Sequence, residues 1–171
     1  AAMGTALAGA PRSWIARSVV PHGDHNVDVF FEQCERVADG FISRAKDFDP
    51  ALPDRDIHQA LRNQWVFNSI QALCGRPAAL THSSFAYSML YPLTDNRLDA
   101  PDLPAEERSS LLRWLSSRLA GVEPGEHEDD CHAQIARLLD MIEEEFPRRS
   151  FPDVHRSLLA IHDAQKQALV L

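Results

Sequence analysis

Residues 91–99 read YPLTDNRLD and place two carboxylates, Asp95 and Asp99, four positions apart after an apolar-aromatic run. If the stretch is helical, both side chains lie on one face, with their Cβ atoms about 5–6 Å apart. Ala100 and Pro101 follow, so we expect the pair in the last turn of a helix. The partial negative charge of a helix C-terminus also favours a cation there. The stretch therefore predicts a core helix that carries a candidate cation site at its end.

Outward from this stretch, apolar residues recur at helical spacing between breaks that are marked by Pro and Gly. No alternating run is long enough to predict a strand. The expected helices cover residues 27–48, 54–73, 78–98, 104–121, 135–146 and 152–171, after a short, weak candidate at 11–20 and a turn at 21–26. We therefore predict an all-α fold, a bundle of about six helices.

Two of these helices carry features that the structure can test. In 54–73, one expected core stripe consists of Ile57, Leu61, Trp65, Asn68 and Ala72. Val66, Ile70 and Leu73 are expected beside it. In 78–98, an internal proline at position 92 should kink or break the helix, at a cost of about 3 kcal/mol if nothing compensates.

Length and composition limit the architecture and the function. A chain of 171 residues fits one domain, so we expect an N-terminal extension over 1–26 and a single helical domain over 27–171. A net charge of −8 argues against a nucleic-acid surface. The three cysteines lie far apart, without disulfide or zinc spacing, and favour a reducing compartment. No run of about 18 apolar residues predicts a membrane span, so we expect a cytoplasmic protein. The apolar end at 168–171 suggests a helix that is cut in mid-course, and hence a truncated chain.

Several polar residues have two interpretations each. The Asp95 and Asp99 carboxylates could hold Mg²⁺, a hard cation that prefers oxygen ligands, or be solvated acids at a helix end. Asn68, His162 and Gln165 lie on or beside apolar stripes, where they could line a cavity or be satisfied core groups. The His-containing stretch 126–132 lacks zinc spacing and is expected as acidic loop. The arginines at 148 and 149 are expected as an exposed pair between helices.

Residues 93–99, LTDNRLD, in an all-helical chain resemble the first aspartate-rich motif of class I isoprenoid (terpenoid) synthases. Residues 76–78, RPA, 91–95, YPLTD, and 161–165, IHDAQ, are together similar to a bacterial branch of that group. The resemblance implies that residues 27–171 form the N-terminal half of an all-α fold with a central cavity. The second metal motif of such enzymes does not follow Asp99 here.

The function that the resemblance implies is Mg²⁺-dependent ionisation of a prenyl diphosphate to a carbocation. Asp95 and Asp99 would be the catalytic metal ligands, and the metal would bind the diphosphate. The candidate substrate-binding residues are Asn68, Tyr91, Arg97, His162 and Gln165. The expected partners are the prenyl diphosphate and either a second copy of the chain or a missing C-terminal half. The alternative function is a non-catalytic helical bundle that serves as an interaction or scaffold module.

Overall fold

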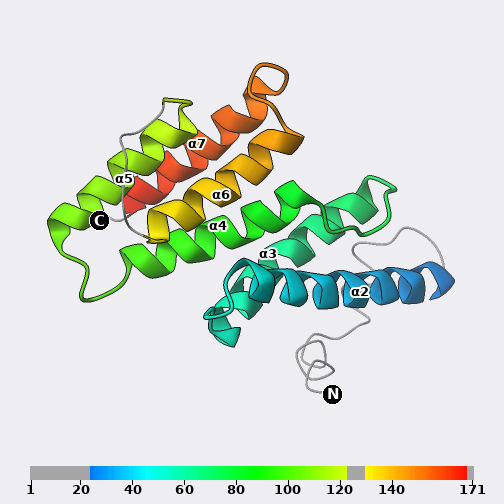
Figure 1. Ribbon diagram of the computed structural model, residues 1–171. Coiled ribbons are helices and arrows are strands. Elements are labelled where there is room, and N and C mark those ends of the chain that lie inside the picture. Colours follow the sequence, from blue (N-terminus) through cyan, green and yellow to red (C-terminus); the bar gives the residue numbers. More distant parts are fainter. Residues whose placement is uncertain (1–23, 123–129, 169–171) are drawn as a thin grey trace. The chain divides into compact units, whose positions relative to one another are not determined.

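The computed structural model describes residues 24–122 and 130–168, and all regular structure in these ranges is helical (Figure 1). The six described helices are α2 (Asp24–Phe48), α3 (Asp54–Leu73), α4 (His82–Leu98), α5 (Ala105–Leu119), α6 (Asp130–Glu145) and α7 (Pro152–Ala168). They confirm the predicted all-α class. The short helix expected at 11–20 lies outside the described residues. No described helix combines the length and the apolar character that a bilayer crossing requires.

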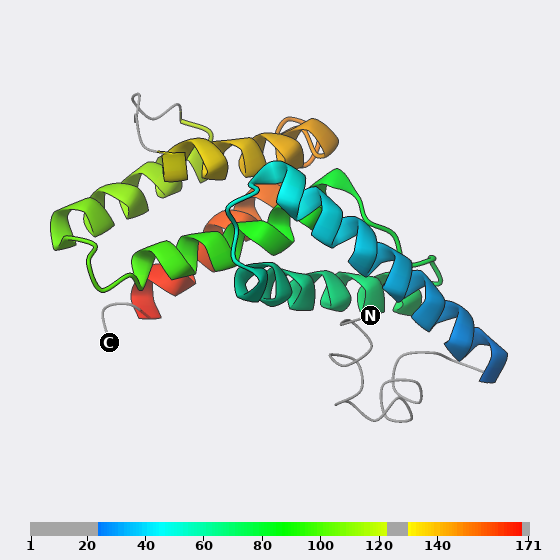
Figure 2. The ribbon, with the colours of Figure 1, turned by 60° about the horizontal axis from the view of Figure 1, so that its bottom comes forward.

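The helices form two compact units, one that ends at Leu80 and one that begins at Thr81. The single domain expected over 27–171 remains a prediction. In the first unit, α2 and α3 form an antiparallel hairpin (Figure 2). One apolar stripe at helical spacing is buried along α2; its members are Phe30, Cys34, Val37, Phe41 and Ala45. The helix begins at Asp24, so the turn expected at 21–26 is wrong from residue 24 onward.

The outer residues of α3 correct a prediction. Val66, Ile70 and Leu73 do not lie beside the core but are 59%, 51% and 60% exposed. The buried face of α3 is centred on Ile57, Leu61, Gln64 and Asn68. At about 100° per residue, Val66 stands nine positions and half a turn away from Ile57. The helix therefore has two apolar stripes on opposite sides, and only one of them is buried.

Three glutamines hold the segment between α3 and α4 in place. Gln33 accepts a hydrogen bond from the backbone N–H of Ala78 at 2.9 Å, and Gln71 accepts one from Ala79 at 3.0 Å. The carbonyl of Ala79 accepts from Gln71 at 3.2 Å and from the buried Gln64 at 3.5 Å. This glutamine clamp uses backbone groups that a helix would need, so α4 begins at His82 rather than at the expected residue 78.

In the second unit, α4 packs along α6, and α5 packs on α6 and α7 (Figure 1). Thr81 begins α4 with a capping box, in which its hydroxyl accepts from Ser84 N–H and the Ser84 hydroxyl accepts from Thr81 N–H. The helix then passes through Pro92 without the expected break. Pro92 is buried, so burial of its apolar ring offsets the free-energy cost of the helical hydrogen bond that proline cannot donate.

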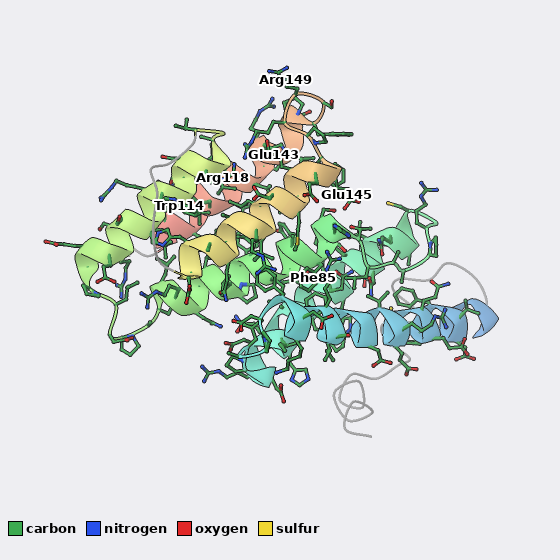
Figure 3. All side chains as sticks on the ribbon, viewed as in Figure 1. Phe85, Trp114, Arg118, Glu143, Glu145 and Arg149 are labelled. Carbon is green, nitrogen blue, oxygen red and sulfur yellow. The ribbon has the colours of Figure 1, made fainter. Side chains whose placement is uncertain are left out.

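The predicted exposed arginine pair is wrong for one of its members. Arg148 is half-buried and donates to the backbone carbonyls of Leu119 at 2.7 Å and Arg118 at 2.9 Å, at the end of α5. It also lies 3.0 Å from the carboxylate of Glu143, which points toward Arg118 as well (Figure 3). Arg149 is exposed and projects away from this group (Figure 3). Arg148 thus donates to the carbonyl of Leu119 at the end of α5, and it adds a second donor to the carbonyl of Arg118, which also accepts from Gly121 N–H at 3.1 Å.

Candidate metal centre

The two aspartates lie where the sequence predicts them, in the last turn of α4. Asp99 is the C-cap residue, and its backbone N–H donates to the carbonyl of Asp95 at 2.8 Å. Asp95 is half-buried and Asp99 is exposed. The helical backbone between them keeps the i, i+4 relation that puts both side chains on one face.

Gln165 of α7 brings a third polar side chain to this turn. Its Nε2 donates to Oδ1 of Asp95 at 2.9 Å. The two residues are 70 positions apart in the chain, and α5 and α6 lie between their helices in sequence. The structure therefore joins Gln165 to Asp95, two of the residues predicted for the site.

The electrostatics of the turn disfavour a bare carboxylate at Asp95. Burial raises the pKa of Asp95, and the negative charge of Asp99 raises it further. Both causes penalise the ionised form, because the group loses water and faces a like charge. The C-terminal end of the α4 dipole acts in the same direction. A cation between the two carboxylates would favour their ionised forms and so offset these effects.

Aromatic rings lie one turn earlier on α4. Tyr91 is half-buried and packs edge-on against Tyr87, with ring centroids 4.9 Å apart. Burial raises the pKa of Tyr91, with smaller contributions from Tyr87 and from the charge of Asp95, so its hydroxyl stays protonated. Arg97 lies 3.7 Å from Glu107 of α5, a partly exposed ion pair.

Two of the predicted site residues are held in other networks. Asn68 belongs to the first unit, where it is buried, accepts from Gln64 Nε2 at 2.9 Å and faces Cys34 Sγ at 3.8 Å. His162 is buried in α7, and its Nε2 lies 3.0 Å from the hydroxyl of Ser116. Burial lowers the pKa of His162, so its neutral form is favoured. Both residues fit the interpretation as satisfied core groups.

No role is predicted for Thr94 or Ser116 from sequence patterns. Thr94 is buried inside the motif, and its hydroxyl donates to the carbonyls of Leu90 at 2.9 Å and Tyr91 at 3.0 Å. A threonine inside a helix can donate to the i−3 and i−4 carbonyls, so the sequence alone could have predicted these two bonds. Ser116 pairs with a residue 46 positions away, so no local pattern could reveal it.

Within residues 24–122 and 130–168, no group of three or more His, Cys, Asp or Glu side chains is placed to hold a metal ion. Comparison with known protein families, curated proteins and solved structures finds no match to this chain. What the centre does must therefore be argued from its own residues.

Proposed function

We propose that this chain binds Mg²⁺ through Asp95 and Asp99, and that the metal binds a prenyl diphosphate whose allylic C–O bond is ionised. The observation that carries the proposal is the 2.9 Å contact between the Asp95 carboxylate and the Gln165 amide, beside a second carboxylate at the end of a helix. Mg²⁺ is usually held by one or two carboxylates, waters and substrate phosphates. The residues present supply the protein's share of that set.

The distance between the Gln165 amide and the Asp95 carboxylate fits such a site. Two neighbouring oxygens of an octahedral Mg²⁺ site lie about 3 Å apart, because each metal–oxygen distance is about 2.1 Å. Rotation of the Gln165 amide by half a turn would put Oε1 in the place of Nε2, at this spacing from Oδ1 of Asp95. The same side chain can therefore donate to Asp95 without a cation and offer an oxygen when one binds.

The surroundings suit the chemistry that the resemblance implies. Bound Mg²⁺ would act as a Lewis acid that draws charge onto the diphosphate leaving group. The half-buried Tyr91 and Tyr87 rings pack edge-on one turn before Asp95, and an aromatic face is a group that can stabilise a nearby carbocation.

Calorimetric titration of Mg²⁺ in the presence of inorganic diphosphate tests the binding step. We expect the full chain to bind and Asp95→Asn to lose binding. Asp102→Asn, at an exposed acid beyond the helix, should bind like the parent chain. Gln165→Met should weaken binding about 10-fold or more, and Gln167→Met, at an exposed position of the same helix, should not. Equal binding by the Asp95 and Asp102 variants would refute the site.

The catalytic step needs its own measurement. Diphosphate release from geranyl, farnesyl and geranylgeranyl diphosphate should require Mg²⁺ and the Asp95 carboxylate. Binding of Mg²⁺ and diphosphate without release from any of the three would limit the function to binding.

One observation favours the alternative function, a helical interaction or scaffold module. Gln165 already donates to one oxygen of Asp95. In a scaffold module, the role of this bond would be to tie α7 to α4. In that case Gln165→Met lowers the free energy of unfolding while Mg²⁺ and diphosphate have no effect on it. The proposed metal site instead requires that Mg²⁺ with diphosphate raises the thermal midpoint of the parent chain.

A further inference from the structure

The outer face of α3 is a second apolar stripe, on the side of the helix opposite the buried Ile57 face. Val66, Ile70 and Leu73 are spaced at i, i+4 and i+7, and each is more than half exposed. An ordinary surface helix has one apolar stripe and a polar outer face. Contiguous exposed apolar residues on such a helix mark an interaction site.

The charge around this stripe is positive in an acidic chain. None of the 25 acidic residues lies between positions 57 and 94, although the chain carries a net charge of −8. Arg62 is one turn before Val66 on the same outer side, and Arg76 lies three residues beyond the end of α3. Both arginines are exposed, and within the described part of the chain neither takes part in an ion pair.

We propose that the outer face of α3, formed by Val66, Ile70 and Leu73 with Arg62 and Arg76 at its ends, binds an amphipathic helix of a partner protein that has acidic residues beside its apolar stripe. The i, i+4, i+7 spacing spans about 10 Å, or two helical turns, and matches the anchors through which helices bind to one another. The arginines select acidic residues at both ends of the partner. The proposal depends on α3 alone and is independent of the proposed metal site.

The charges also argue against two other occupants. Two copies of this face would bring guanidinium groups close together, whether the helices pair parallel or antiparallel, and like charges disfavour such a contact. An anionic membrane would attract the two arginines but repel a chain of net charge −8. A short acidic apolar helix brings no guanidinium groups together, and it meets only the acid-free outer face of α3, whereas an extended membrane surface also meets the acidic remainder of the chain.

Fluorescence anisotropy with two designed 15-residue peptides tests the proposal. Both peptides are helical and carry leucines at i, i+4 and i+7. One has glutamates beside the stripe, and the other has lysines at the same positions. We expect the full chain to bind the glutamate peptide and to bind the lysine peptide at least about tenfold more weakly.

Variants of the chain distinguish binding at the outer face of α3 from non-specific binding of the peptide. Ile70→Ser and Arg62→Glu should each weaken binding of the glutamate peptide about tenfold, and both positions are exposed, so the fold should persist by circular dichroism. Val29→Ser, at an exposed apolar residue of α2, should have no effect.

Three results would overturn the proposal. The first is no binding of the glutamate peptide, or equal binding of both peptides. The second is a dimer in light scattering that Ile70→Ser dissociates, which would assign the face to a second copy. The third is Ile70-dependent binding to vesicles of phosphatidylserine and phosphatidylcholine, which would assign it to a lipid surface.

Discussion

Truncation of Arg148 to alanine should destabilise the second unit through the end of α5. The guanidinium donates to two backbone carbonyls, Leu119 and Arg118, and pairs with Glu143. Hydrogen bonds to a charged donor contribute about 1.5–3 kcal/mol each. Here the carbonyls can regain water after truncation, and the arginine side chain is 22% exposed. The ion pair adds less than about 1 kcal/mol. We therefore expect a loss of about 3 kcal/mol.

The neighbouring arginine supplies a matched control. Arg149 is exposed, so Arg149→Ala should change the free energy of unfolding by less than about 0.5 kcal/mol. Arg148→Lys keeps the charge but cannot reach both carbonyls with a planar fork, so it should recover only part of the loss. Urea denaturation followed by circular dichroism measures all three variants.

The result that would refute this reasoning is a similar small change for Arg148→Ala and Arg149→Ala. It would mean that water replaces the guanidinium at both carbonyls without cost. A loss restricted to low salt would indicate that the ion pair with Glu143, rather than the two backbone bonds, carries the effect.

Three further predictions concern the same unit. Thr81→Ala removes the capping box of α4 and should cost about 1 kcal/mol in urea denaturation, and no loss would contradict the box. The pKa of His162 is lowered in the folded chain, so below about pH 6.5 the unfolded chain binds a proton more readily than the folded chain does. The free energy of unfolding should therefore fall from pH 7 to pH 5. It should fall less steeply in His162→Gln. The raised pKa of Asp95 makes its ionised form a cost at neutral pH, so Asp95→Asn should stabilise the fold at pH 7 by less than about 1 kcal/mol. That difference should shrink as the pH falls toward 4, and an opposite sign would show that the carboxylate stabilises the fold.

The parts of the fold that could be predicted are those that depend on local periodicity. Ile135, Leu138, Leu139 and Ile142 form one stripe in the sequence, and all four are buried in α6. The two aspartates were placed in the last turn of a helix by the proline that follows them, and this placement is confirmed. Both inferences use residues within a few turns of each other, for which helical geometry alone decides the outcome.

The parts that could not be predicted depend on contacts between distant segments. Helical geometry puts the two apolar stripes of α3 on opposite sides, and only the packing of α2 decides that the Ile57 side is buried. The bond between Gln165 and Asp95 joins residues 70 positions apart. The path of the chain at Ala78 and Ala79 depends on glutamines from two other places in the sequence. No periodicity encodes such pairings.

The alkylation rate of the buried Cys34 thiol can measure how often the hairpin of α2 and α3 opens. Burial raises the pKa of Cys34 to about 11, and Asn68 lies against its sulfur. The thiolate is the nucleophile that attacks an alkylating reagent, so this cysteine should react only when the hairpin separates. Cys74, at the exposed end of α3, should be labelled at once under the same conditions. The ratio of the two alkylation rates, read by mass spectrometry, then gives the free energy of opening of this hairpin without a mutation or an added probe.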